Sequence, residues 1–385
     1  MKSGEKSFLV FGSPALGKSE IDEVHQCLES GWIGTGPRVA QFEEEFRKYK
    51  GVPHAVALNS CTAALHLSLL AAGISEGDEV ITTPMTFCAT VNSIIHAGGK
   101  PVLVDVEPDT FNIDVEAIER RITPKTKAIL PVHFAGRPCK MDRLMEIASR
   151  HGLMVIEDCA HAIEAEYHGK KIGTFGDFGC FSFYVTKNVT TGEGGMLLAR
   201  KEEHSVRAKR LGLHGMSQDA WKRFGDTGYK HYEVVEAGFK YNMMDMQAAI
   251  GIHQLRKVNE FRKRREEIWN AYTEAFAGLP ITLPAAIEPN TVHSYHLYTL
   301  LIDEARCGVK RDEFLERMTR EKIGVGVHYV SMTDHKFYQD KFGWKTEDYP
   351  HSTRIGRQTV SIPISPKLTD EDVLRIIQSV KRSLE

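Results

Sequence analysis

The segment from Val155 to Met196 contains a carboxylate and a lysine whose positions suit them for chemistry at one site. Asp158 ends an apolar run that is typical of a buried strand, and Lys187 lies between a serine-aromatic run and a glycine-rich turn. A carboxylate at the end of a buried strand can hold a cation by charge pairing. A lysine held in a polar pocket can lose its proton and attack a carbonyl carbon.

This pair of residues suits pyridoxal phosphate, which needs an amine for a Schiff base and a carboxylate against its ring nitrogen. The alternative for Lys187 is a solvated lysine in a polar loop, which holds for nearly every lysine. Against that alternative stand the apolar runs on both sides of the loop. Three glycines also permit a close backbone approach there: Gly192, Gly194 and Gly195.

Strands and helices alternate through the first half of the chain, with strand-like runs such as HAVAL, EVITTP and KAILPV each followed by a helical pattern. One of these helices is expected after a cap at Asp114. The alternation predicts βαβ units and a mainly parallel sheet, whose ligands bind beyond the carboxyl ends of the strands. We therefore expect four groups of residues along one edge: Asn59 to Thr62, Pro84 to Phe87, His133 and Asp158.

Three features on this edge each have a structural and a functional interpretation. A helix that starts near Cys61 presents free N–H groups to a phosphate, although capping by a hydroxyl such as that of Thr62 is more common. Phe87 can lie flat on an aromatic ligand or belong to the core. His161 would share a face with Asp158 if a helical turn begins there, whereas a lone histidine usually has a structural partner.

Length and composition limit the class of protein. The 385 residues exceed what one hydrophobic core usually holds. We therefore expect a large domain over residues 1–260 and a small domain over residues 261–385. The N-terminal residues could pack on the small domain. Lys and Arg (49) nearly balance Asp and Glu (51), which argues against nucleic acid or an anionic membrane as partner.

The cysteines and the N-terminus bear on location. The seven cysteines have no CxxC or Cys/His ligand spacing, so we expect a reducing compartment and no metal. The apolar run near the N-terminus is too short for a signal peptide or a membrane span. A cytoplasmic protein is the resulting prediction.

Several motifs that follow one another along the chain resemble those of one family: GWIGTGP, NSCTAALHL, EDCAHA, SFYVTKNVTTGEGGM, GFKYNMMDMQAAIG and GVGVHYVSMTDHKFY. They are similar to the DegT/DnrJ/StrS family of pyridoxal-phosphate-dependent nucleotide-sugar aminotransferases. The resemblance implies an α/β protein of fold type I, with a mainly parallel mixed sheet flanked by helices and a smaller C-terminal α+β domain. Within the family the chain looks closest to enzymes acting on UDP-4-keto sugars, such as UDP-4-amino-4-deoxy-L-arabinose aminotransferase.

The resemblance also implies roles for the residues that match the family motifs. Lys187 would be the catalytic lysine of the internal aldimine, and Asp158 the partner of the pyridinium nitrogen. Phe87 would stack on the cofactor ring, and His161 would lie near its phenolic oxygen. The cofactor phosphate would be held by three further residues: Cys61, Thr62 and Ser182.

A homodimer with shared active sites is a further implication of the resemblance. Family members complete the phosphate site from the neighbouring subunit, with the segment matched here by Gly238 to Met243. Many relatives read GxNYR there, whereas this chain has Lys240 and Asn242, and either could reach across. His328 and Tyr329 could line a substrate entrance as a set, although each has a structural interpretation when taken singly.

The expected activity is a ping-pong transfer of an amino group from glutamate, which leaves as 2-oxoglutarate, to a keto carbon of a nucleotide-linked sugar. UDP and carbon C4 are favoured only through the resemblance, and polysaccharide biosynthesis is the expected context. One alternative is the dehydratase branch of the family, which has histidine in place of Lys187. Another is a non-catalytic regulator of the same fold, which the intact set of Asp158, Ser182 and Lys187 disfavours.

Overall fold

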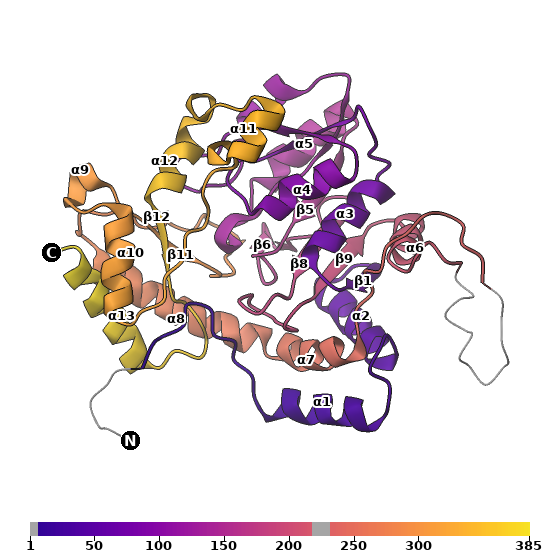
Figure 1. The fold of residues 1–385 in the computed structure, drawn as a ribbon, viewed down its shortest axis with the longest axis horizontal. Coiled ribbons are helices and arrows are strands. Elements are labelled where there is room, and N and C mark those ends of the chain that lie inside the picture. Colours follow the sequence, from indigo (N-terminus) through magenta and orange to yellow (C-terminus); the bar gives the residue numbers. More distant parts are fainter. Residues whose placement is uncertain (1–6, 218–231) are drawn as a thin grey trace.

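The computed structural model describes residues 7–217 and 232–385, and a seven-stranded sheet lies at its centre (Figure 1). The strand order is β1-β9-β8-β5-β4-β2-β3. The strands are β1 (His54–Leu58), β2 (Glu79–Thr82), β3 (Lys100–Leu103), β4 (Thr126–Ile129), β5 (Met154–Asp158), β8 (Phe178–Ser182) and β9 (Gly195–Ala199). Neighbours from β8 to β3 are parallel, whereas β9 is antiparallel to both β1 and β8. The sheet is therefore mixed and mainly parallel, which confirms the predicted fold class.

Helices pack on both faces of this sheet. They are α1 (Lys18–Glu29), α2 (Pro37–Lys50), α3 (Cys61–Ala71), α4 (Cys88–His96), α5 (Met141–His151), α6 (Glu202–Leu211) and α7 (Asp245–Arg256). Successive side chains of β5 point to opposite faces, so Val155 packs in a core with α2, α5 and α7 while Ile156 packs in another with α3 and α6. Burial on both faces explains why the strand is a continuous apolar run.

Helix α8 (Val258–Phe276) leads from the sheet to a second core (Figure 1). Val258 belongs to the core beside the sheet, whereas Ile268 and Tyr272 belong to the second core. That core contains the antiparallel pair β11 (Tyr298–Leu301) and β12 (Thr359–Ile362) with α10 (Arg311–Arg320) and α13 (Asp370–Ser383). The domain boundary after residue 260 stays a prediction, although it falls on this connecting helix.

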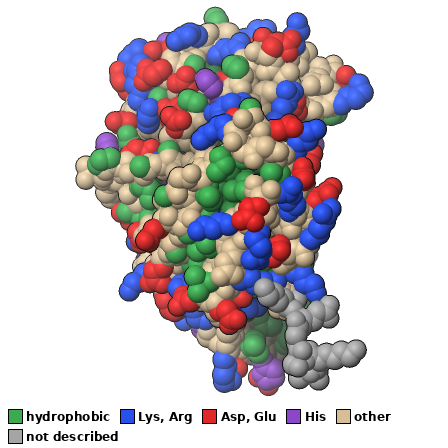
Figure 2. Space-filling view, turned by 90° about the vertical axis from the view of Figure 1, so that its left-hand side faces the viewer, with side chains coloured by type: hydrophobic (Ala, Val, Ile, Leu, Met, Phe, Trp, Pro, Cys, Tyr) green, Lys and Arg blue, Asp and Glu red, His purple; other side chains and the backbone are tan. Residues whose placement is uncertain are grey.

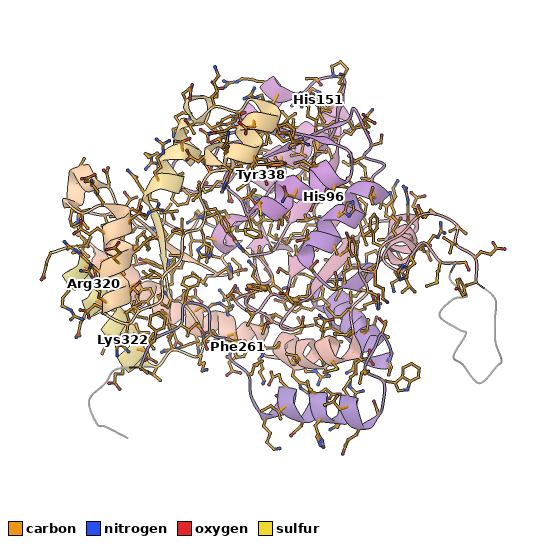
Figure 3. The ribbon with its side chains drawn as sticks, viewed as in Figure 1. His96, His151, Phe261, Arg320, Lys322 and Tyr338 are labelled. Carbon is orange, nitrogen blue, oxygen red and sulfur yellow. The ribbon has the colours of Figure 1, made fainter. Side chains whose placement is uncertain are left out.

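The remaining helices and strands are short, and some of them join the two halves. They are the short strands β6 (Glu166–Tyr167), β7 (Lys170–Lys171) and β10 (Thr291–Val292) and the helices α9 (Glu304–Cys307), α11 (Lys336–Phe342) and α12 (Pro350–Gln358). Helix α11 packs on α4, since the Tyr338 hydroxyl donates to Oδ1 of Asn92 at 2.7 Å, one turn from His96 (Figure 3). The start of the described chain also contacts both halves of the molecule. Leu9 forms a parallel bridge with Ile323 of the second core, and Gly12 lies tightly against Thr186, in the loop that contains Lys187.

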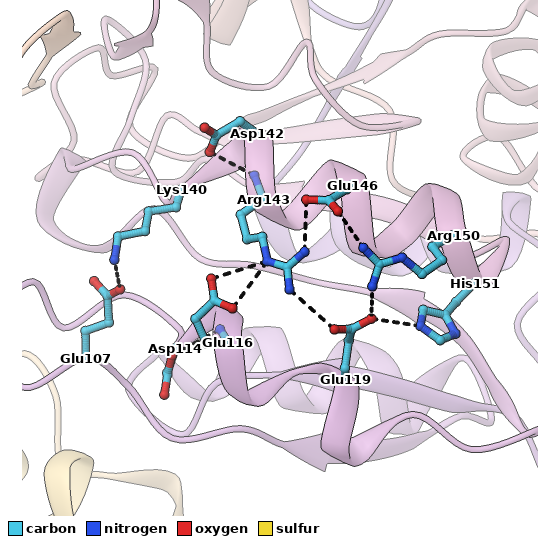
Figure 4. A network of polar contacts seen from close by, with 10 residues as sticks. All are labelled: Glu107, Asp114, Glu116, Glu119, Lys140, Asp142, Arg143, Glu146, Arg150 and His151. Carbon is cyan, nitrogen blue, oxygen red and sulfur yellow. Dashed lines mark hydrogen bonds and ion pairs between the residues drawn. The ribbon is translucent and has the colours of Figure 1, made fainter.

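The cap predicted at Asp114 is confirmed, but the helix that follows it is short and of the 3-10 type. Two 3-10 turns stand there, η1 (Val115–Ala117) and η2 (Glu119–Arg121), and Asp114 caps the first by accepting the N–H of Glu116 at 3.1 Å. Acidic side chains from these turns pair with Arg143 and Arg150 on α5 in a surface network (Figure 4).

Charged side chains of both signs are interspersed over the face shown in Figure 2, in agreement with the nearly balanced composition. None of the helices within residues 7–217 and 232–385 combines the length and the apolar character needed to cross a bilayer.

Candidate active site

A cavity of about 520 Å³ lies at the edge where β1, β5 and β8 end. It brings together most of the predicted site residues: Cys61, Thr62, Phe87, Asp158, His161, Ser182, Lys187, His328 and Tyr329. His328 and Tyr329 come from the C-terminal half of the chain, and the others follow strand ends of the sheet. A larger cavity of about 600 Å³ near the end of β9 holds none of these residues. Residues from three of the four groups predicted at this edge of the sheet therefore line one cavity.

Lys187 lies in the loop after β8, where its N–H donates to the carbonyl oxygen of Tyr184 at 2.9 Å. Within the described ranges, its Nζ makes no hydrogen bond or ion pair with another residue. Burial lowers the pKa of the Lys187 amine to about 8, although the nearby Asp158 carboxylate acts in the opposite direction. A neutral amine, the form that attacks an aldehyde, is therefore accessible near pH 8.

This pKa predicts how the protein without cofactor captures pyridoxal phosphate. The rate of covalent capture should rise with pH and level off above about pH 8, because the lysine is then mostly neutral. An ordinary solvated lysine would give a rate that keeps rising towards pH 10. The measurement is the growth of near-visible absorbance after mixing, and a rise that continues through pH 9 to 10 would contradict the lowered pKa.

Asp158 is the last residue of β5 and is only 4% exposed. Its Oδ2 accepts the hydroxyl of Thr90 at 2.8 Å, and its Oδ1 accepts the N–H of Ala160 at 3.1 Å. Burial raises the pKa of this carboxyl, while these two hydrogen bonds lower it. A protonated ring nitrogen in the cavity would supply the charge partner that a buried carboxylate lacks.

Thr90 is a functional contact that the sequence prediction missed. It lies three residues after Phe87 on α4, a spacing that places both on one side of the helix. Phe87 itself is 58% exposed, with its ring 5.9 Å from that of Tyr329. Its exposure excludes the core interpretation and leaves its face open to a ligand.

His161 stands on a turn, and no helix begins after Asp158. Its Nδ1 accepts the N–H of Ala135 at 3.2 Å, and its Nε2 lies 3.0 Å from the hydroxyl of Tyr329. His328 is fixed by a contact of 2.9 Å between its Nδ1 and Oγ of Ser361. Burial lowers the pKa of His328 to about 4, so the ring is neutral at physiological pH.

The start of α3 provides the anion-binding part of the cavity. Oγ of Ser60 caps the helix by accepting the N–H of Ala63 at 3.1 Å. The N–H groups of Cys61 and Thr62 have no acceptor inside the helix, as at any helix start, and they face the cavity region with the positive end of the dipole. Ser182 lines the same cavity. The donors for a phosphate and the carboxylate for a ring cation are therefore present together, which fits pyridoxal phosphate.

A buried polar network behind Lys187 fixes the residue that follows it. Nδ2 of Asn188 donates to Glu164 at 2.8 Å, and Oδ1 of Asn188 lies 2.9 Å from Nδ1 of His296. Glu164 also pairs with Arg265 of α8, and both side chains are 1% exposed. No local pattern in the sequence indicates this network, because its members are far apart along the chain.

Breaking the buried ion pair should destabilise the protein strongly. Arg265→Met leaves the Glu164 carboxylate buried without its cation, and loss of one partner of such a pair costs about 3–5 kcal/mol. Lys336→Ala is the matched control, since its pair with Asp340 is exposed and contributes less than about 1 kcal/mol. Urea unfolding measures both, and equal midpoints for the two variants would contradict the assigned importance of the buried pair.

His133, Glu157 and Cys159 form a second buried group of potential ligands, with their ligand atoms within 4.8 Å of one another. The carboxylate of Glu157 accepts three backbone N–H groups, each at 2.8 Å, and contacts Nε2 of His133 at 3.2 Å. These hydrogen bonds use the oxygen lone pairs and bind β5 to the turn before β8. The group has a structural role, and His133 points away from the cavity although it stands at the predicted edge.

Lys240 and Asn242 do not line the cavity of their own chain. Nζ of Lys240 donates to Oδ1 of Asn242 at 2.6 Å, and Nδ2 of Asn242 donates to the hydroxyl of Thr35 at 2.6 Å. This arrangement ties the segment to the GWIGTGP loop. Their expected reach into a neighbouring subunit stays a prediction.

The fold and the cavity define the class of protein as a pyridoxal-phosphate enzyme of fold type I. A model of the DegT/DnrJ/EryC1/StrS aminotransferase family matches residues 14–381, and the chain belongs to this family. This finding confirms the family, the enzyme class and the cofactor predicted from the sequence.

Similar proteins match over almost the whole chain. The uncharacterized protein MJ1066 of Methanocaldococcus jannaschii is 50% identical and covers 98% of each chain. The spore coat polysaccharide biosynthesis protein SpsC of Bacillus subtilis is 46% identical, over 97% of this chain and 96% of that one. The structure of the putative sugar aminotransferase Spr1654 of Streptococcus pneumoniae in its PMP form has a TM-score of 0.90, with 32% identity and 98% coverage of both chains.

Proposed function

We propose that the enzyme transfers an amino group from glutamate to a keto carbon of a nucleotide-linked sugar in a ping-pong reaction. The observation that carries the proposal is Lys187, whose unpartnered amine has a pKa of about 8 and opens into the same cavity as Asp158. When bound there, pyridoxal phosphate supplies an electron sink for the donor's alpha carbon.

The residues of this chain would do the remaining work. Asp158 keeps the ring nitrogen protonated, because a buried carboxylate stabilises the adjacent cation. The exposed face of Phe87 packs on the ring, and Ser182 with the start of α3 holds the phosphate. Lys187 would move a proton at the donor's alpha carbon, which requires a neutral amine near physiological pH.

Relatives support a sugar as the acceptor. One is a spore coat polysaccharide biosynthesis protein, and another is a putative sugar aminotransferase whose structure covers 98% of both chains. We propose that the acceptor sugar is linked to a nucleotide. UDP is the favoured nucleotide, and C4 is the favoured acceptor carbon. Polysaccharide biosynthesis is the proposed context.

Incubating the pyridoxamine form with a panel of nucleotide-linked keto sugars tests the substrate. A true acceptor should restore the near-visible absorbance of the pyridoxal form in a single turnover, and a UDP-linked 4-keto sugar should do so fastest. The Lys187→Ala variant, given the same sugars, is the control for slow uncatalysed exchange. Return of absorbance with 2-oxoglutarate but with none of the sugars would contradict the proposed acceptor.

We further propose a homodimer in which the Lys240 to Asn242 segment completes the phosphate site of the other subunit. Mixing inactive Lys187→Ala subunits with inactive Lys240→Ala/Asn242→Ala subunits should then restore activity. Each mixed dimer would contain one site with an intact lysine from one chain and an intact segment from the other. Activity that never exceeds that of the separate variants, in mixed dimers isolated through two different affinity tags, one on each variant, would contradict shared sites.

The non-catalytic alternative makes a different prediction for the purified protein. A regulator without a working site would leave added pyridoxal phosphate with the absorbance of the free aldehyde, without the spectral shift that a Schiff base with a lysine gives. The dehydratase alternative conflicts with the lysine at position 187. A cytoplasmic location also remains part of the proposal. It is supported by seven free thiols, five of them buried.

A further inference from the structure

The cavity of about 600 Å³ near the end of β9 lies at the opposite end of the strands from the candidate active site. Strand β1 begins directly after Pro53, which lines this cavity, and ends two residues before Ser60, which lines the active-site cavity. Strand β8 likewise begins after Asp177 and ends at Ser182. Each strand has five residues and spans about 17 Å, so the two cavities are separate.

The lining of this second cavity has an excess of positive charge. Among the described residues, a single carboxylate, that of Asp177, lines it together with five basic side chains: Lys48, Lys50, Lys170, Lys171 and Arg200. The whole chain is nearly balanced, so the excess is local. The fold creates it by bringing together the end of α2, strand β7 and the end of β9. A concave surface with one sign of charge attracts ligands of the opposite sign.

Two of these cations have no acidic partner. Within residues 7–217 and 232–385, the side chains of Lys170 and Arg200 make no hydrogen bond or ion pair. The Lys170 ammonium lies 4.5 Å from the centre of the Phe175 ring, which holds it by a cation–π contact. Asp177 accepts the N–H of Val155 at 2.9 Å instead of pairing with either cation. Both charges are therefore available to a ligand.

The other three lysines add charge that a ligand can recruit. Nζ of Lys171 lies 2.9 Å from Glu166, and Nζ of Lys48 lies 3.1 Å from Glu44. Such solvent-accessible pairs contribute less than about 1 kcal/mol, so a multivalent anion can compete with these carboxylates. Lys50 is buried at the cavity wall, where its ammonium group donates to two backbone carbonyl oxygens.

We propose that this cavity is a second ligand site, which binds a small anion with an oligophosphate group, either a nucleotide or a free oligophosphate. Its volume falls within the range of about 300–1,000 Å³ that is typical of small-molecule sites. Cations from three segments of the chain suit several linked phosphates better than a single carboxylate. Lysine and arginine side chains both form charge-assisted hydrogen bonds with phosphate oxygens. The site is independent of the proposed sugar transfer.

Calorimetry with tripolyphosphate tests the proposal on protein loaded with pyridoxal phosphate, whose own phosphate then fills the active-site anion position. At low salt the wild type should bind one tripolyphosphate per chain. Lys170→Gln/Arg200→Gln should weaken this binding by about tenfold or more, because two charge-assisted contacts are lost. Raising the salt concentration should weaken the wild-type binding as well, since the contacts are between charges.

Arg120→Gln/Lys263→Gln is the matched control, because it removes the same charge from exposed positions outside the cavity. Its affinity should stay within about twofold of the wild type, since distant surface charges are screened. Equal weakening by the two double variants would show attraction by overall charge alone and would contradict the site. Binding seen only after removal of pyridoxal phosphate would place the anion in the active site and would also contradict it.

ATP distinguishes the two sources of the oligophosphate group. If ATP binds the wild type more tightly than tripolyphosphate does, and the Lys170→Gln/Arg200→Gln variant loses that affinity, the ligand is a nucleotide. Equal affinities of the two compounds, both lost in the variant, identify a free oligophosphate. A failure of the proposed sugar transfer would leave these binding results intact, so the two outcomes are distinguishable.

Discussion

Lys187→Ala is expected to abolish turnover and to remove the near-visible absorbance that pyridoxal phosphate gives with the wild-type protein. The methyl group cannot bond to the cofactor or move a proton, and no other lysine of residues 7–217 and 232–385 lines this cavity. Absorbance spectra and single-turnover assays with glutamate measure both effects. Noncovalent cofactor binding should survive in part, because the phosphate and ring-nitrogen contacts remain.

The control for this substitution is Lys336→Ala, which removes an exposed lysine on α11. It should retain the absorbance and full activity. Substantial turnover by Lys187→Ala would contradict the mechanism, since a second general base would then have to exist.

Asp158→Asn is expected to slow turnover by about a hundredfold or more while the cofactor still binds. The amide keeps the size of the side chain but cannot hold the ring nitrogen as a cation, so the ring accepts electrons poorly. Steady-state kinetics with saturating cofactor measure the effect, and Asp340→Asn on the exposed surface of α11 is the control. A loss of less than about fivefold would contradict the assigned partnership.

The same substitution should not destabilise the protein without cofactor. Burial raises the folded-state pKa of Asp158, so the folded state binds more protons than the unfolded state above pH 3.8 and its stability falls as pH rises through the raised pKa. The ionised carboxylate is therefore the less favourable form in the folded state, and asparagine removes that charge. Thermal unfolding of the cofactor-free Asp158→Asn protein should therefore have a midpoint at or above that of the wild type.

Much of the site was predictable because it depends on local patterns. The strand ending at Asp158, the helix starting at Cys61 and the glycine turn after Lys187 each follow from a few neighbouring residues. Parallel pairing then brings these ends to one edge of the sheet. Roles assigned by resemblance alone remain predictions, including those of Ser182 and Phe87.

Other features could not be predicted because they depend on tertiary contacts. The network of Glu164, Asn188, Arg265 and His296 joins three distant parts of the chain. The turn that carries His161 is stabilised by Ala135 rather than by helical propensity. Ion pairs to α5 stabilise two short turns where a helix was expected after Asp114, and such pairs are not visible in a local pattern.

A lowered pKa does not by itself identify the catalytic lysine. Burial lowers the pKa of Lys50 to about 7, which is below that of Lys187. Nζ of Lys50, however, donates to the carbonyl oxygens of Ile163 and Ile172 at 2.8 and 2.9 Å, and this ammonium group links the end of α2 to the segment before β8. Lys187 differs in having no such acceptors and in facing the cavity.

Mapping the lysine that carries the cofactor tests the central claim most directly. The protein loaded with pyridoxal phosphate is reduced with borohydride, digested, and analysed by mass spectrometry for the modified peptide. The account predicts one stoichiometric adduct, on Lys187. An adduct on Lys50 or on any other lysine, with Lys187 unmodified, would contradict it.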